Sequence, residues 1–199
     1  MLYWLPQVKA AQSLFEAKLM QKRARILKSK TLFRGRVMEL KVQRVIEPGG
    51  VETTREVVCH PGSVVIVPHL PDDRLVLVRQ YRHAVQESLW ELVAGGMERG
   101  ETPIQSARRE LLEETGYRAR VLKPLLEFYP SPGILSEKMH LVEAWDLTPA
   151  QGQPDADERI ETGIFTVNKV MEMIQNREIR DGKTLVGILF LFGTRLAPA

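Results

Sequence analysis

The sequence predicts an α+β protein in which helices cover a mixed β-sheet, with a small β subdomain before it. Short runs rich in β-branched residues, separated by turn residues, predict strands along most of the chain. A sharply bounded helix is predicted among these strands, and two more helices follow at the C-terminal end. Because strands and helices interleave without a strict βαβ rhythm, we expect the sheet to mix parallel and antiparallel strands.

The chain is expected to divide into three parts. Residues 1–30 carry one acid and seven basic residues, which predicts a basic helical extension that packs on the domain or on a partner subunit. A transit peptide and a surface-binding amphipathic helix are the alternatives. Residues 31–58 alternate about a Glu-Pro-Gly-Gly turn, which predicts a β-hairpin subdomain with too little core to stand alone. Residues 59–199 form the main domain.

The strands and helices of the main domain follow from their composition. β-branched and alternating runs predict strands at 63–68, 74–79, 89–94, 118–126, 138–147 and 161–166. Helices are predicted at 103–115, 167–175 and 181–196.

The boundaries of the helix at 103–115 are the clearest local signal. Thr102 can cap its start, Pro103 suits the first helical position, and Gln105 can complete a capping box. Gly116 is a natural C-terminal stop. At 100° per residue its apolar residues share one arc, which predicts the core-facing side: Ile104, Ala107 and Leu111.

A second arc of the same helix carries three carboxylates, Glu110, Glu113 and Glu114. Glu110 and Glu114 are like charges one turn apart, which costs an isolated helix roughly 0.2–0.5 kcal/mol. No Lys or Arg follows within the helix at the spacing that would relieve this repulsion. Such a cluster is also typical of a solvated face, but it suits a divalent cation such as Mg²⁺, which prefers oxygen ligands.

Charge and composition exclude several classes. The formal net charge of +3 is too small to argue for nucleic-acid binding. The longest apolar stretch, near 185–192, is far shorter than a membrane span. Cys59 is the single cysteine, so no internal disulfide is possible, and a reducing, cytoplasmic compartment is expected.

The segment 95–117 reads GGMERGETPIQSARRELLEETGY and fits the pattern G-x5-E-x7-R-E-U-x-E-E-x-G-U, where U is bulky and apolar. At ordinary residue usage, a chance match of its fixed letters is on the order of one in a million. This string resembles the Nudix box. The resemblance implies a Nudix fold, an α/β/α sandwich with a mixed sheet, and cleavage of a nucleoside diphosphate linked to another group with Mg²⁺ or Mn²⁺.

The resemblance also implies roles for residues. Glu110 and Glu114 would be the main metal ligands, and Glu113 a further ligand or the group that orients the attacking water. The main-chain carbonyl of Ala94 would join the coordination. A salt bridge between Glu101 and Arg109 would hold the loop to the helix.

Motifs outside the box are similar to the ADP-ribose pyrophosphatase branch: Val78–Arg82, Leu89–Gly95, His60–Gly62 and Tyr129–Gly133. This likeness implies a homodimer that hydrolyses a small nucleoside diphosphate sugar. ADP-ribose would yield AMP and ribose 5-phosphate. GDP-mannose hydrolysis and non-catalytic nucleotide sensing are the alternatives.

The same likeness suggests further site residues. Arg82 and Arg79 would contact phosphate or terminal ribose, although Arg79 equally suits a plain surface position. Glu137 would accept a hydrogen bond from a ribose hydroxyl, and Phe33 is a candidate adenine contact. The general base is expected on the acidic loop at 151–161, where Glu158 is favoured over Glu161 and Asp157.

Overall fold

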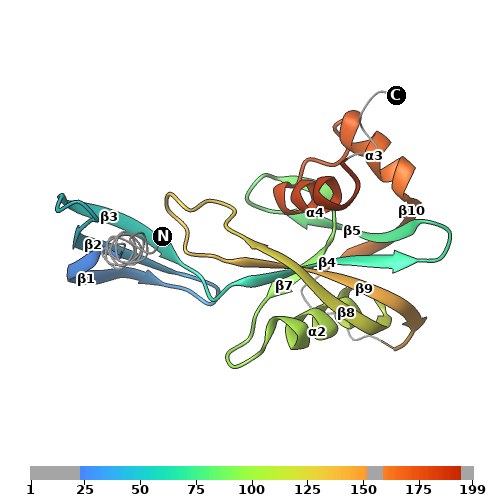
Figure 1. Cartoon of the computed structure of the whole chain (residues 1–199), viewed down its shortest axis with the longest axis horizontal. Coiled ribbons are helices and arrows are strands. Elements are labelled where there is room, and N and C mark those ends of the chain that lie inside the picture. The colour runs from blue at the N-terminus through green and yellow to red at the C-terminus, as the bar shows by residue number, and fades with distance from the viewer. Residues whose placement is uncertain (1–22, 152–158, 194–199) are drawn as a thin grey trace, which may run out of the picture. The chain divides into compact units, whose positions relative to one another are not determined.

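The computed structural model describes residues 23–151 and 159–193 (Figure 1). The chain separates into two compact units, Met1–His60 and Pro61–Ala199. Each unit has its own sheet.

The first unit is a three-stranded antiparallel sheet in the order β1-β2-β3, formed by β1 (Arg25–Arg34), β2 (Glu39–Ile46) and β3 (Glu52–Cys59). The structure therefore differs from the expected two-stranded hairpin at 31–58, and residues 25–30 belong to a strand instead of a helical extension. Register shifts between Ile26 and Lys28 and between Thr31 and Phe33 break the alternation of β1. Such irregularities remove the period-two pattern that would have revealed the strand.

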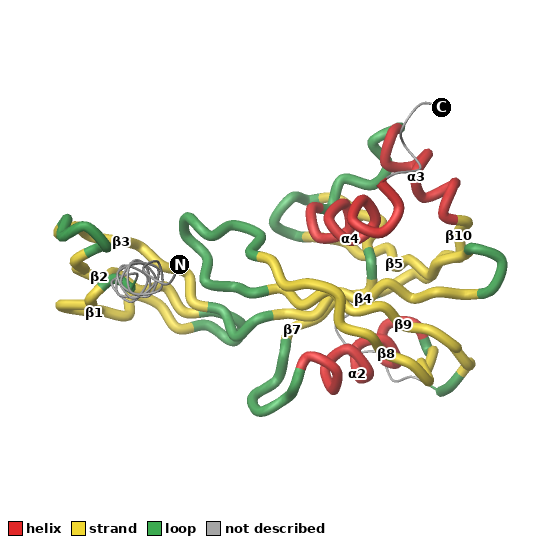
Figure 2. The backbone as a smooth tube through the Cα atoms, viewed as in Figure 1, coloured by secondary structure: helices red, strands yellow, loops and turns green. Residues whose placement is uncertain are grey.

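The second unit is built on a seven-stranded mixed sheet (Figure 2). Its main path has the order β10-β5-β4-β9-β8, with β6 paired to β5 and β7 paired to β4. Strands β4 and β9 are parallel and the remaining pairs are antiparallel. The strands are β4 (Ser63–Leu70), β5 (Arg74–Arg82), β6 (Glu87–Glu91), β7 (Val93–Gly96), β8 (Tyr117–Phe128), β9 (Met139–Pro149) and β10 (Ile160–Thr166).

Helices cover both faces of this sheet, which confirms the predicted sandwich. Helix α2 (Pro103–Thr115) lies on one face, and α3 (Val167–Gln175) and α4 (Gly182–Phe192) lie on the other (Figures 1 and 2). Within the described residues, none of the helices combines the length and apolar character needed to span a membrane.

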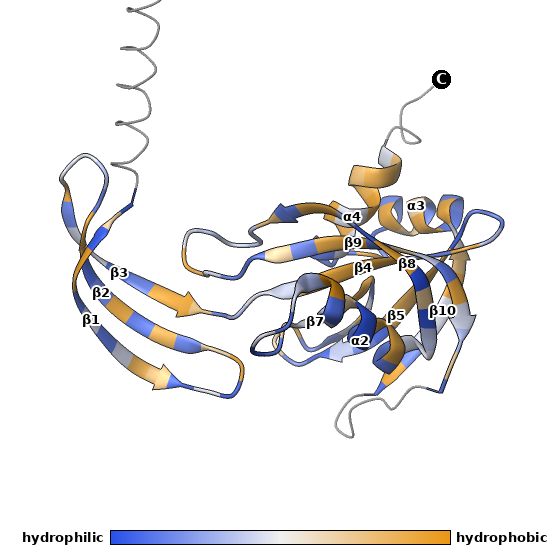
Figure 3. Cartoon of the chain, turned by 60° about the horizontal axis from the view of Figure 1, so that its bottom comes forward, coloured by the Kyte–Doolittle hydropathy of each residue, from blue (hydrophilic) through white to orange (hydrophobic). Residues whose placement is uncertain are grey.

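The central strand β4 serves both cores because successive side chains point to opposite faces. Val65 and Val67 belong to the core beneath α3 and α4, whereas Val64 and Ile66 belong to the core beneath α2. Figure 3 shows the resulting hydrophobic colour along β4. A strand buried on both faces reads as a continuous apolar run, as the sequence of β4 does.

The predicted single strand at 89–94 is two strands. Residues before Leu92 form β6 and pair with β5, where Glu91 lies opposite Val78. Residues after it form β7 and pair with β4, where Val93 lies opposite Ile66. Apart from Glu91 the segment 89–94 is apolar and has no turn residue, so only the choice of pairing partner reveals the break.

Helix α4 is anchored to the sheet at its first turns. Asp181 caps it by accepting a hydrogen bond from the Thr184 amide at 2.9 Å, and the Thr184 hydroxyl accepts one from the Leu92 amide at 2.8 Å. At Gly187 the backbone approaches so closely that an added Cβ would lie 2.6 Å from Leu92 Cδ1. Because Gly187 has no side chain, α4 can pack this close to the sheet.

Substituting Gly187→Ala should destabilise the fold by about 1–3 kcal/mol, because the added methyl overfills a closely packed contact. Thermal unfolding measures this loss. Gly182→Ala is the matched control in the same helix, since a Cβ there meets no atom within 4 Å. Equal melting temperatures for the two variants would contradict the close approach at Gly187.

Candidate active site

Helix α2 has the predicted ends and faces. The Thr102 side chain accepts from the Gln105 amide, the Gln105 side chain accepts from the Thr102 amide, and Gly116 adopts the left-handed conformation with φ 69°. Ala107 and Leu111 are fully buried in the core beneath the helix. The predicted capping box and core face are therefore confirmed.

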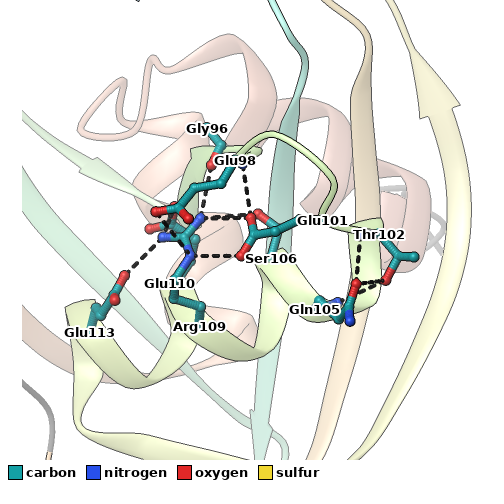
Figure 4. Close-up of polar contacts among 9 residues, drawn as sticks. All are labelled: Gly96, Glu98, Glu101, Thr102, Gln105, Ser106, Arg109, Glu110 and Glu113. Atoms are coloured by element: carbon teal, nitrogen blue, oxygen red, sulfur yellow. Dashed lines mark hydrogen bonds and ion pairs between the residues drawn. The ribbon is translucent and has the colours of Figure 1, made fainter.

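The Arg109 guanidinium contacts several polar groups in this region at once (Figure 4). Its Nε and Nη2 donate to the two carboxylate oxygens of Glu101 at 3.0 Å each, which confirms the predicted salt bridge. Nη1 donates to Glu110 at 2.8 Å and to Glu113 at 2.9 Å, and Nη2 also donates to the carbonyl of Gly96 at 3.0 Å. One guanidinium thus ties the loop, the helix and strand β7 together.

This cluster corrects the expectation that the glutamates of α2 lack a relieving cation. The counter-charge is Arg109, which precedes Glu110 directly and pairs with Glu113 one turn on. These contacts, led by the hydrogen bond to Glu101, raise the pKa of Arg109 above its usual value. The hydrogen bond from Arg109 in turn lowers the pKa of Glu101, so this pair is ionised at neutral pH.

The carboxylates of Glu110 and Glu114 point toward strand β7 and are mostly buried, with 9% of each residue exposed. The Glu114 carboxylate accepts a hydrogen bond from the Ala94 amide at 3.4 Å. A Cβ added at Gly95 would overlap the carboxylate of Glu110. Gly95 is therefore needed for the space it leaves to this side chain.

These residues fit a divalent cation bound by oxygen. Two buried carboxylates one turn apart border a strand that supplies backbone carbonyls, and Mg²⁺ commonly uses one or two carboxylates together with substrate phosphates. Across the described ranges 23–151 and 159–193, no group of three acidic, histidine or cysteine side chains could hold a metal. Glu110, Glu114 and the Ala94 carbonyl would hold the ion, with substrate oxygens completing its ligands.

A cavity of about 230 Å³ opens at one end of the sheet next to these carboxylates. It is lined by the first residues of the parallel strands β4 and β9, Ser63 and Met139, and by residues at the ends of β5 and β7, Arg82 and Gly96. Antiparallel neighbours bring strand starts and strand ends to the same edge, so the topology gathers these residues. The remaining lining residues are Ala94, Gly95, Glu137 and Lys183.

Two of the predicted substrate residues therefore line this cavity. Glu137 is buried, with 9% of the residue exposed, and its carboxylate accepts a hydrogen bond from the Ser63 hydroxyl. Arg82 donates to Glu91 through Nε at 2.9 Å and Nη2 at 2.7 Å. These bonds raise the pKa of Arg82, and the charge of Glu114 adds to the effect.

Sequence reasoning missed three residues here, Ser63, Glu91 and Lys183. Glu91 is 1% exposed, and Lys183 donates to it from the start of α4. The available signals were an acid within the otherwise apolar run 89–94 and a lysine two residues after a helix cap. The pairing of Glu91 with Lys183 cannot be predicted from the sequence around either residue, because it depends on how α4 docks on the sheet.

The structure does not show Arg79, Phe33 or Glu158 at this cavity. Arg79 does not line it; its side chain lies 3.7 Å from Glu161 on the neighbouring strand β10. Phe33 lies on β1 of the first unit and is 54% exposed. Glu158 lies outside the described residues.

Residues 60–185 match the NUDIX domain family model, so this chain belongs to the Nudix family, as a Nudix hydrolase of the ADP-ribose pyrophosphatase-like branch. It is 35% identical over 162 residues to the ADP-ribose pyrophosphatase of Bacillus subtilis (strain 168), covering 80% of this chain and 88% of that protein. It is also 35% identical over 167 residues to the methanol dehydrogenase activator of Bacillus methanolicus, covering 83% and 90%.

The structural comparison agrees with the sequence comparison. A crystal structure of an ADP compounds hydrolase superposes with a TM-score of 0.75 at 25% identity, covering 86% of this chain and 94% of that one. The predicted α+β Nudix fold is thereby confirmed.

Substituting Gly95→Ala should displace the Glu110 carboxylate and weaken Mn²⁺ binding by about tenfold or more, the loss typical when a ligand's support is removed. Isothermal calorimetry with Mn²⁺ measures this. Gly96→Ala is the matched control, because a Cβ there meets no atom within 4 Å. If both variants bind Mn²⁺ as the unmodified chain does, the space beside Gly95 has no bearing on the metal site.

Proposed function

We propose that this chain hydrolyses the pyrophosphate bond of ADP-ribose, or of a related nucleoside diphosphate sugar, with Mg²⁺ or Mn²⁺. AMP and ribose 5-phosphate are the products from ADP-ribose. The observation that carries the proposal is the cavity in which Arg82 and Glu137 meet the strand bordering Glu110 and Glu114. Names of relatives that act on ADP-ribose and ADP compounds favour the same substrate class.

The residues divide the chemistry between them. Glu110, Glu114 and the Ala94 carbonyl would hold the cation, which when bound neutralises negative charge on the diphosphate and lowers the pKa of water. Arg82 binds a phosphate oxygen through the donors that Glu91 leaves unused, since a guanidinium has five N–H groups. Glu113, held at 2.9 Å by Arg109, orients the attacking water.

The reaction joins the water oxygen to one phosphorus and breaks that atom's bond to the bridging oxygen. A base must take the proton of the water, and the departing phosphate carries away the bridging oxygen. We assign the base to Glu158, which lies on the acidic loop before β10 in the sequence.

Glu137 and Ser63 recognise the sugar. A buried carboxylate accepts hydrogen bonds well, and its neighbour Ser63 already donates one to it. A ribose hydroxyl in the cavity would donate a second. This arrangement favours a substrate with free hydroxyl groups on the half that enters the cavity.

The first unit is proposed to mediate homodimer formation in a cytoplasmic protein that uses neither membranes nor nucleic acid as partners. The sheet and its β1–β2 turn expose several large apolar side chains, as expected of a surface that another copy covers: Ile26, Leu27, Leu32, Val37 and Met38. Phe33 is exposed on the same sheet, and we assign it to contact with the adenine ring instead of the dimer surface. Measurement of the mass in solution tests the dimer.

Incubation with ADP-ribose and Mg²⁺ should release AMP and ribose 5-phosphate faster than GDP-mannose is cleaved. Glu114→Gln should lower turnover at least about a hundredfold, because it removes a ligand charge without changing volume. Chromatography of the nucleotide products follows both reactions. Tight ADP-ribose binding without cleavage would indicate a nucleotide sensor, and faster GDP-mannose cleavage would reassign the substrate.

Glu158→Gln tests the assignment of the base. Loss of a general base should lower kcat by about 10²–10⁴-fold and leave KM nearly unchanged. Glu161→Gln, at the start of β10, and Asp157→Asn, next to Glu158 in the sequence, are measured beside it as comparisons. A small change for Glu158→Gln with a large one for either neighbour would move the base to that residue.

A further inference from the structure

Lys183 lies at the start of α4, where its side chain meets two carboxylates. Its ammonium donates to Glu91 and lies 3.0 Å from Asp181 Oδ1. The side chain is 11% exposed and lines the 230 Å³ cavity together with Arg82. Burial of a lysine is costly unless its charge is compensated, so this position is specified by its surroundings.

Arg82 and Lys183 come from opposite ends of the second unit's sequence and share one acceptor. Glu91, which is 1% exposed, receives two hydrogen bonds from Arg82 and one from Lys183. The two cations line the cavity, but Glu91 does not. The cavity therefore meets two positive groups, with their shared carboxylate behind them.

The donors of this cluster favour an anionic ligand in the cavity. Glu91 and Asp181 offset the charges of Arg82 and Lys183, so both cations can be held side by side in their ionised forms. An ammonium has three protons, and Glu91 and Asp181 account for two of them.

We propose that Lys183 is a substrate-binding residue that holds a phosphate oxygen of the diphosphate beside Arg82, and that Glu91 is the positioning residue for both cations. This inference rests on the proposed function and deepens it. The diphosphate would lie between the carboxylate side of the site, where Glu110 and Glu114 hold the cation, and the Arg82–Lys183 wall. A substrate with one phosphate could not engage both sides equally.

The anchoring of α4 makes the position of Lys183 rigid. Its flanking residues are fixed, since Asp181 caps the helix and the Thr184 hydroxyl accepts from the Leu92 amide. Leu92 directly follows Glu91, so the same contact that seats α4 also seats the shared carboxylate. A lysine that served only solubility would need neither constraint.

The test compares Lys183→Met, which removes the charge at similar length, with Lys169→Met. Lys169 lies on α3, is half exposed, and pairs with Glu172 at 2.7 Å, so it is a matched lysine away from the cavity. For each variant, KM and kcat are measured for ADP-ribose with Mg²⁺. The dissociation constant of α,β-methylene ADP-ribose, which cannot be cleaved, is measured by calorimetry, and folding is checked by thermal unfolding.

Lys183→Met should raise KM and the dissociation constant of the analogue by about tenfold or more, as expected for a lost charge-assisted hydrogen bond. The kcat should stay within about threefold, because the contact is made in ground and transition states alike. Lys169→Met should match the unmodified chain. Values for Lys183→Met within about twofold of the unmodified chain overturn the proposal.

Two controls keep the outcomes separate. If Lys183→Met does not fold, Lys183→Gln decides by the same measurements, since its amide can still donate to Glu91 without carrying charge. If the unmodified chain neither cleaves ADP-ribose nor binds the analogue, the proposed function itself fails, and the role of Lys183 fails with it. An active unmodified chain with an unaffected Lys183→Gln refutes the role of Lys183 alone.

Discussion

The candidate site depends on a single guanidinium that holds four oxygen-bearing groups in fixed positions. Arg109 binds Glu101, Glu110, Glu113 and the Gly96 carbonyl, so it joins the loop before α2, the helix itself and strand β7. A planar fork with five donors can serve these directions at once, which the point charge of a lysine cannot. The repulsion among the helix carboxylates is thereby offset without covering the face of Glu110 and Glu114 toward β7.

The sandwich explains how distant parts of the sequence reach one cavity. Helix α2 on one face brings its carboxylates against β7, whose residues line the cavity, and α4 on the other face contributes Lys183. Because β4 is buried on both faces, each helix is seated by its own apolar core. The charged groups are therefore positioned by packing, and their own attractions need only adjust the final geometry.

Local chemistry made much of this predictable. The ends of α2 follow from Thr102, Gln105 and Gly116, and helix α3 and the strands of the second unit lie close to their predicted ranges. Strand β1 was not predictable, because its bulges hide the alternation, and the break at Leu92 lies in a segment with no turn residue to mark it. The Glu91–Lys183 pair is a tertiary contact between segments whose separate sequences carry no sign of each other.

The break at Leu92 has a consequence for how this protein can change over evolutionary time. The acceptor shared by the two cavity cations precedes Leu92, and the glycine that makes room for Glu110 follows three residues later. Deletion or insertion of one residue between them would turn the later side chains of β7 to the opposite face of the sheet. Both sides of the cavity therefore depend on the number of residues between Glu91 and Gly95, so new specificities are more accessible through point substitutions than through changes in length here.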